Sequence, residues 1–114
     1  MSERLIYKLL NHEDARAADL SYTSNTALDA ADGYVHLSTR AQVAETAALH
    51  YKGLEGVVLM EFDTAELGGA MRWEASRGGD LFPHLYAPLD VRKAARRWTL
   101  QLNNDGIPQM PDDF

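Results

Sequence analysis

The chain has 114 residues, of which 46% are hydrophobic and 25% charged, with a formal net charge of -6 at pH 7. This length suits one compact domain over residues 1–114 and is too short for two. The negative charge argues against nucleic-acid binding, in which Lys and Arg neutralise phosphates. The absence of cysteine excludes disulfides, thiolate metal sites and cysteine nucleophiles. The apolar run before Asn11 is too short for a signal peptide or a membrane span, so we expect a cytoplasmic protein without a membrane partner.

The first third of the chain predicts a strand, a helix and a loop. The apolar run from Leu5 to Leu10 favours a strand. Asn11 can cap a helix over His12 to Leu20, because its side-chain oxygen can accept a free amide of the first turn. Residues 21–32 are rich in Ser, Thr, Asn and Asp and predict mostly loop.

A second strand and a second helix follow. Tyr34 to Leu37 predicts a strand after an Asp-Gly turn. The sequence from Thr39 to Gln42 has the spacing of a capping box, so a helix begins there, and Gly53 ends it.

The rest of the chain predicts strands joined by short turns. Short connections favour antiparallel pairing, so we expect an α+β domain with two helices near its N-terminus. The later strands are Val57 to Phe62, Met71 to Ala75, Phe82 to Tyr86 and Arg96 to Leu102.

Two of these strands carry a histidine within an alternating pattern. Side chains of an extended chain point alternately to opposite faces, so each segment has an aromatic and polar row backed by an apolar row. A strand that lines a ligand-binding cleft needs this pattern. The candidate cleft residues are Tyr34, His36 and Ser38 in the first segment and Phe82, His84 and Tyr86 in the second.

Each candidate has a functional and a structural interpretation. His36 can bind a ligand hydroxyl or transfer a proton, or it can simply bond to backbone. Ser38 can contact a ligand or cap the following helix. His84 and Tyr86 can serve a ligand or pack in the core. Glu74 can orient an imidazole or act as a base, or it can pair with Arg72 on the surface.

Two further chemistries stay open on the sequence. His36, His84 and Glu74 together would form a two-histidine, one-carboxylate metal site, although no paired-histidine spacing supports it. A basic stretch can anchor an anionic ligand group or be a solvated surface. That stretch holds Arg92, Lys93, Arg96 and Arg97.

The same segments resemble a known family. The matching stretches are Asp32 to Ser38, Val58 to Met60 with Trp73-Glu74, Phe82 to Leu89, Asp105-Gly106 and Pro111. They are similar to a family of small bacterial proteins known as domain of unknown function 952, over about residues 5–111. A tryptophan common in the family's first helix is absent here, and Ala87 stands where the family often has glycine.

The resemblance implies a distant relationship to the ADP-ribosyltransferase fold, a curved and split, mostly antiparallel sheet with an NAD-binding cleft. A His-Gly-Ser or His-Gly-Thr string lines the nicotinamide–ribose pocket of that fold, and His36-Leu37-Ser38 is similar to it. The resemblance therefore implies that His36 contacts a ribose and Ser38 supports the pocket. Glu74 would be the carboxylate that stabilises developing positive charge, His84 a proton carrier or a second ribose contact, and Tyr86 a stacking surface.

The predicted function is binding of a nucleotide-like ligand, with ADP-ribosyl transfer or NAD glycohydrolysis as the reaction. NAD would then be a substrate, and no cofactor is required. The alternatives are a non-catalytic module that binds a small molecule or peptide, and a metal-dependent enzyme using the two histidines and Glu74. We expect a monomer or a weak dimer.

Overall fold

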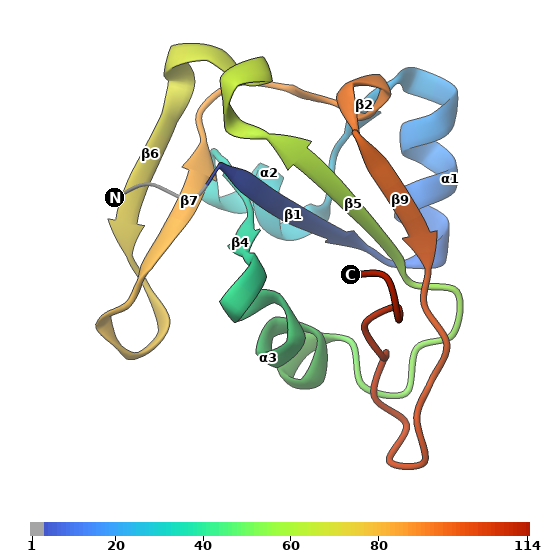
Figure 1. Ribbon diagram of the computed structural model, residues 1–114. Coiled ribbons are helices and arrows are strands. Elements are labelled where there is room, and N and C mark those ends of the chain that lie inside the picture. Colours follow the sequence, from blue (N-terminus) through green and yellow to red (C-terminus); the bar gives the residue numbers. More distant parts are fainter. Residues whose placement is uncertain (1–3) are drawn as a thin grey trace.

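The largest of three antiparallel sheets forms the centre of the molecule (Figure 1). The structure is a computed structural model that describes residues 4–114, apart from the side chain of Arg77. The sheet has the order β4-β1-β5-β9, and every pairing in it is antiparallel. Its strands are β1 (Leu5–Leu10), β4 (Ser38–Thr39), β5 (Val58–Asp63) and β9 (Arg96–Thr99).

A second sheet has the order β3-β7-β6, and a short ladder joins β2 to β8. All of these pairings are antiparallel as well, and the one between β7 and β6 is the pairing that their short connection predicted. The three-stranded sheet holds β3 (Val35–His36), β7 (Leu81–Leu85) and β6 (Met71–Ala75). The short ladder holds β2 (Thr23–Ser24) and β8 (Leu89–Asp90).

Three α-helices lie within residues 4–114, and two of them begin at caps that the sequence predicted. They are α1 (His12–Ser21), α2 (Ala27–Asp32) and α3 (Arg40–His50). The amide of Asp14 donates to Asn11 Oδ1 at 2.8 Å, which begins α1. The capping box of α3 is present, with the amide of Thr39 donating to Gln42 Oε1 at 3.0 Å.

The prediction of mostly loop over residues 21–32 is wrong, because this segment contains β2 and α2. Thr26 caps α2, since the amide of Asp29 donates to Thr26 Oγ1 at 3.1 Å. Gly33 ends this helix with φ of 83°, a left-handed conformation that glycine adopts without strain. Thr26, one of the polar residues that favoured the loop prediction, therefore serves as a helix cap.

Two predicted strands are shorter than expected. The predicted strand from Tyr34 to Leu37 divides, because the chain leaves the second sheet after His36 and enters the first at Ser38. The amide of Leu37, between them, still donates to Pro83 O at 3.1 Å. The predicted strand from Arg96 to Leu102 ends at Thr99.

The two faces of the larger sheet pack against separate cores. Alternation along β1 places Ile6 and Leu10 in the first core, which lies between the two sheets and includes Ala15 and Ala18 of α1. The opposite face forms the second core, beneath α3. Its members are Tyr7, Leu9, Val43, Ala47, Val57, Leu59 and Leu100. Within residues 4–114, no helix has both the length and the apolar character needed to cross a membrane.

Candidate functional site

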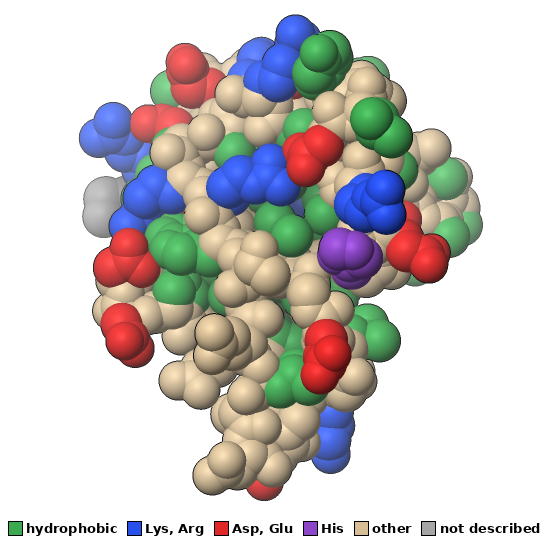
Figure 2. All heavy atoms as spheres, turned by 90° about the vertical axis from the view of Figure 1, so that its right-hand side faces the viewer, with side chains coloured by type: hydrophobic (Ala, Val, Ile, Leu, Met, Phe, Trp, Pro, Cys, Tyr) green, Lys and Arg blue, Asp and Glu red, His purple; other side chains and the backbone are tan. Residues whose placement is uncertain are grey.

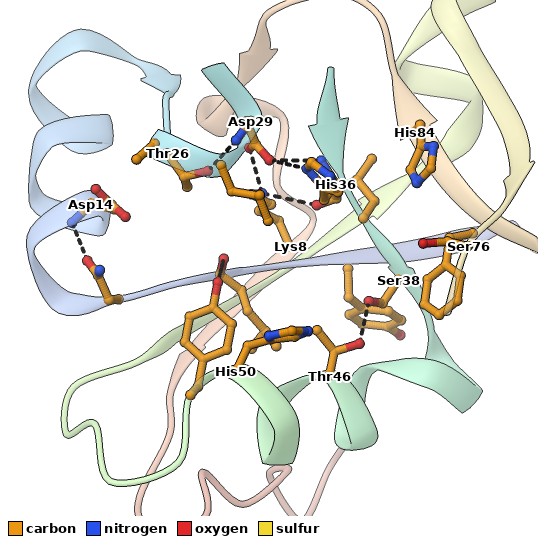
Figure 3. A pocket seen from close by; sticks show the side chains of 18 of the residues that line it. Lys8, Asp14, Thr26, Asp29, His36, Ser38, Thr46, His50, Ser76 and His84 are labelled. Carbon is orange, nitrogen blue, oxygen red and sulfur yellow. Dashed lines mark hydrogen bonds and ion pairs between the residues drawn. The ribbon is translucent and has the colours of Figure 1, made fainter. Parts of the chain in front are cut away.

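A cavity of 380 Å³ opens where the edge of β1 loses its partner (Figure 3). The strand β4 pairs only with Ile6 and Tyr7, because the chain has just crossed from the other sheet. The edge of β1 from Lys8 onward therefore faces the space between α2, β3 and α3. Tyr51 covers part of this edge by donating its hydroxyl to Leu9 O at 3.0 Å. The change of sheet at Leu37 thus creates the cavity.

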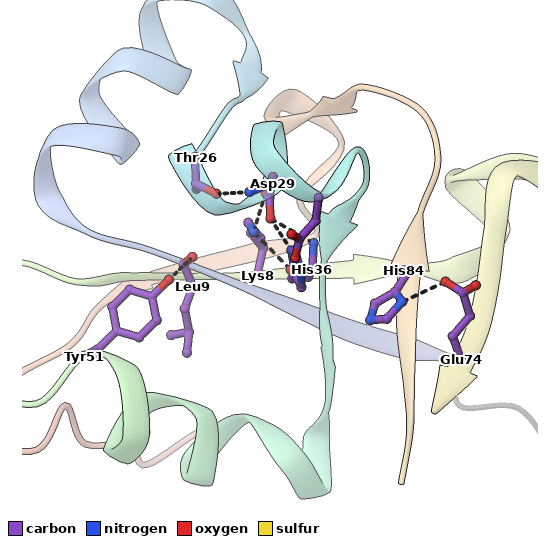
Figure 4. Close-up of polar contacts among 9 residues, drawn as sticks. Lys8, Leu9, Thr26, Asp29, His36, Tyr51, Glu74 and His84 are labelled. Carbon is purple, nitrogen blue, oxygen red and sulfur yellow. Dashed lines mark hydrogen bonds and ion pairs between the residues drawn. The ribbon is translucent and has the colours of Figure 1, made fainter. Parts of the chain in front are cut away.

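A buried ion pair lies at one end of the cavity (Figure 4). Lys8 Nζ donates to Asp29 Oδ2 at 2.7 Å and to His36 O at 3.0 Å. The side chains of Lys8 and Asp29 are 4% and 6% exposed. Burial lowers the pKa of Lys8, although Asp29 acts in the opposite direction. Burial alone would raise the pKa of Asp29, but the charge of Lys8 and the hydrogen bonds from Lys8 and His36 outweigh it and lower that pKa.

His36 lies between two carboxylates. Its amide and its Nδ1 contact Asp29 Oδ1 at 3.1 and 2.6 Å, and its Nε2 lies 2.9 Å from Asp32 Oδ2. A carboxylate only accepts hydrogen bonds, and a neutral imidazole has one N–H, so only a doubly protonated ring can donate to both. The ring is fixed at its end of β3 and is 27% exposed.

His84 is held by Glu74 on the neighbouring strand. Its Nδ1 lies 2.8 Å from Glu74 Oε1, which also accepts the hydroxyl of Tyr86 at 2.7 Å. The hydrogen bonds from Tyr86 and His84 lower the pKa of Glu74, so the carboxylate is an acceptor and Nδ1 carries the proton. The other nitrogen, Nε2, points away from Glu74 toward the cavity, and none of the polar groups that the structure describes forms a hydrogen bond with it (Figure 4).

The two histidines meet across the strand pair β3–β7. His36 and His84 are partners in the register, and their ring centroids lie 5.6 Å apart. The ring of Tyr34 packs against both, at 4.5 Å from His36 and 4.2 Å from His84, and lies 5.1 Å from the ring of Tyr86. We call these four residues the ring cluster. The strand register alone thus brings together two histidines that are 48 positions apart in the sequence.

The predicted cleft residues divide between two hollows. The cavity is lined by His36, Ser38, Phe82 and His84. Tyr34 and Tyr86, the two tyrosines of the ring cluster, instead line a second and more open hollow. Ser38 contacts Thr46 Oγ1 at 3.2 Å, across the start of α3.

Glu74 lines neither hollow and lies behind His84. Its proximity to His84 and Tyr86 follows from their common face of the β6–β7 pair. The contact with Glu74 holds the imidazole of His84 in place.

Sequence reasoning did not identify Lys8, Asp29 and Tyr51. A signal existed for Lys8, because a single lysine within an apolar central strand requires a buried partner. No comparable signal marked Asp29, since it lay in a segment interpreted as loop. Burial and then the carboxylates of Asp29 and Asp14 raise the pKa of Tyr51 to about 12, although no feature of its local sequence marked it as a site residue.

The geometry gives little support to a metal site. Within the described residues, no group of three or more His, Asp or Glu side chains is arranged to hold a metal ion. His36, His84 and Glu74 lie close together, but both nitrogens of His36 and Nδ1 of His84 already contact carboxylates.

The basic stretch is paired with acidic side chains or backbone oxygens. Figure 2 shows basic and acidic side chains interspersed on the face that carries α1 and β9. Such a surface offers no concentrated positive patch to an anionic ligand. The contacts are Arg92 with Asp90, Lys93 with Glu66 O, Arg96 with Glu61 and Arg97 with Asp19.

Comparison with solved structures gives close matches over nearly the whole chain. The crystal structure of protein CC0527 from Caulobacter crescentus is 44% identical, with a TM-score of 0.87 over 92% of this chain and 93% of that one. A double mutant of the same protein gives 43% identity and a TM-score of 0.87. Its solution NMR structure gives 43% identity and a TM-score of 0.83 over 96% of each chain.

The family comparison covers both histidine strands. No curated protein matches the chain. The model of the family described as "Protein of unknown function (DUF952)" matches residues 8–96, which include Lys8, Asp29, His36 and His84. The chain therefore belongs to the DUF952 family.

Proposed function

We propose that the cavity binds a small ligand of nucleoside size, in which hydroxyl groups stand beside a ring. The observation that carries this proposal is the pairing of His36 with His84 at the cavity, each held by a carboxylate. An imidazole fixed in this way presents a defined nitrogen to a ligand hydroxyl. His84 Nε2 can accept the hydrogen bond of a ribose hydroxyl, while Phe82 offers an apolar surface beside it.

Size and charge favour a nucleoside over a complete dinucleotide. The volume of 380 Å³ lies near the lower end of the range of roughly 300–1,000 Å³ for small-molecule sites. Of the described residues that line the cavity, Lys8 alone is a lysine or arginine, and Asp29 already matches its charge. The buried end therefore offers no unmatched positive charge to a phosphate, which suits a nucleoside-sized group such as the nicotinamide–ribose half of NAD, with any phosphate left toward solvent.

The resemblance of His36-Leu37-Ser38 to the nicotinamide–ribose string supports the same ligand class. All three residues line the cavity. Leu37 occupies the position of the glycine in that string, and its side chain belongs to the first core.

Thermal unfolding with and without nicotinamide riboside, adenosine or NAD tests the proposal. A ligand at about 100 times its Kd stabilises the folded state by about 2.7 kcal/mol. We expect at least one nucleoside to raise Tm for the wild type and not for His84→Ala. The matched control is His12→Ala, because His12 is exposed and lines neither hollow. The absence of any shift, or an equal shift in His84→Ala, would contradict the proposal.

Cleavage of NAD is a second candidate function, favoured by the contact between Glu74 and His84. In this reaction a water or acceptor hydroxyl attacks the ribosyl carbon, the bond to nicotinamide breaks, and His84 Nε2 takes the attacking group's proton. Glu74 would hold the imidazole and stabilise its charged form. The products are nicotinamide and ADP-ribose, free or attached to the acceptor.

Release of nicotinamide from NAD measures this second function. We expect Glu74→Gln to lower kcat with little change in KM, because Glu74 lies outside the cavity. If the wild type releases nicotinamide no faster than Glu74→Gln does, catalysis is rejected. The binding proposal is then still decided by the thermal unfolding experiment.

A further inference from the structure

Two carboxylates are found among the described residues that line the cavity, and one of them has no partner. Asp29 is bound by Lys8 and His36. The amide of Asp14 donates to Asn11 Oδ1, but within the described part of the chain no group forms a hydrogen bond or an ion pair with the Asp14 carboxylate. The cavity therefore contains one carboxylate that is free to bind a ligand.

The Asp14 carboxylate faces the cavity from the first turn of α1 (Figure 3). The residue is half-buried. Burial raises the pKa of Tyr51 and lowers the pKa of Lys8, and the charge of Asp14, after that of Asp29, also acts on both groups. Asp14 is therefore within electrostatic reach of two other side chains that line the cavity.

The opposite side of the cavity also presents a hydrogen-bond acceptor. His84 is 3% exposed, and its Nε2 points toward the cavity as an acceptor, because Nδ1 carries the proton held by Glu74. Figure 3 shows His84 and Asp14 on opposite sides of the cavity, with Lys8 between them in this view. A ligand that spans the cavity therefore meets an acceptor at each side.

The chemistry of a carboxylate determines which ligand groups it can bind. An ionised carboxylate only accepts hydrogen bonds, so the ligand atom beside Asp14 must carry a proton. Carboxylates bind the exocyclic amino groups of nucleobases in this way. A carbonyl oxygen, a carboxylate or a phosphate at the same place would meet a negative charge and be repelled.

We propose that Asp14 selects nucleosides whose ring carries an exocyclic amino or amide N–H₂ group, which donates to its carboxylate while a ribose hydroxyl donates to His84 Nε2. This inference rests on the proposed function and deepens it, because it names the class of ring that the cavity accepts. Adenosine is the simplest probe, and purine riboside, which lacks only the amino group, is its matched partner.

Isothermal titration calorimetry with the two probes tests the proposal. We expect adenosine to bind about tenfold more tightly than purine riboside, because the amino group adds a hydrogen bond to a charged acceptor. In Asp14→Ala the two affinities should become equal. Nicotinamide riboside and nicotinic acid riboside form the corresponding pair for a pyridine ring, since only the amide can donate to Asp14.

The matched control is Glu13→Ala, which should keep the preference for the amino nucleoside. Glu13 lies in the same first turn of α1, but it is exposed and does not line the cavity. Both variants remove one negative charge from that turn, so their effects on the helix dipole are comparable.

Two kinds of failure are distinguishable. If the members of each pair bind the wild type equally, or if Asp14→Ala keeps the preference, Asp14 does not select the ring, and the proposed nucleoside site still stands. If neither adenosine nor nicotinamide riboside binds the wild type, the proposed function fails and this inference fails with it.

Discussion

Loss of the Lys8 ammonium should destabilise the protein strongly. Lys8 connects the two sheets, because it extends from β1 to Asp29 of α2 and to the carbonyl of His36 on β3. The variant Lys8→Met leaves the carboxylate of Asp29 buried, with only its bonds from His36. Breaking a buried pair in this way costs about 3–5 kcal/mol, a large part of a typical total stability of about 5–15 kcal/mol.

Replacement of both partners separates the charge effect from packing. The double variant Lys8→Met/Asp29→Leu removes the unpaired charge and loses the two hydrogen bonds from His36, worth about 1 kcal/mol each. Since an apolar replacement of a buried pair is otherwise close to neutral, the double variant should lose about 2 kcal/mol. It should therefore be more stable than Lys8→Met alone.

Urea unfolding measures these free energies. The control is Arg97→Ala, which breaks an ion pair with Asp19 whose side chains are 44% and 49% exposed. That loss should stay below about 1 kcal/mol. If Lys8→Met costs no more than Arg97→Ala, or if the double variant is the least stable, the buried pair does not join the sheets as argued.

Three further predictions concern capping and titration. Thr26→Ala should cost about 1 kcal/mol of unfolding free energy, because it removes the cap of α2; a change below about 0.3 kcal/mol would contradict that role. The pKa of Tyr51 is raised from 10.0 to about 12, so its neutral form stabilises the fold below pH 10 and this contribution is lost as pH rises toward 12; Tyr51→Phe should lose less stability over that window in alkaline unfolding curves. The pKa of Asp29 is lowered from 3.8, so its contribution is present above that pH and lost as pH falls through the lower folded value; Asp29→Asn should flatten the acid limb of the stability curve, and an unchanged limb would refute the assignment.

Local sequence signals predicted those parts of the fold that depend on neighbours in the chain. The strands Leu5–Leu10 and Met71–Ala75 have the predicted bounds, and α3 begins at the predicted capping box. The helix α2 was missed because its residues favour turns when taken alone. Its formation depends on the Thr26 cap and on the pairing of Asp29 with Lys8, a residue 21 positions away.

The candidate site was predictable to the same extent. Alternation placed His36 and His84 on polar faces, and the register of β3 with β7 brings those faces together. The division into two hollows could not be predicted, because it depends on the chain changing sheets at Leu37. After that change, the two histidines of the ring cluster line the first cavity, and its two tyrosines, Tyr34 and Tyr86, line the second hollow.

The most direct test of the proposed nucleoside site is the nitrogen spectrum of the histidine rings. A proton–nitrogen correlation spectrum of the free protein should show the His84 proton on Nδ1, as the contact with Glu74 requires. Addition of nicotinamide riboside should then move the His84 Nε2 resonance, while the nitrogen resonances of the His12 ring stay unchanged. A proton on Nε2 in the free protein, or an Nε2 resonance that no nucleoside moves, would contradict the account.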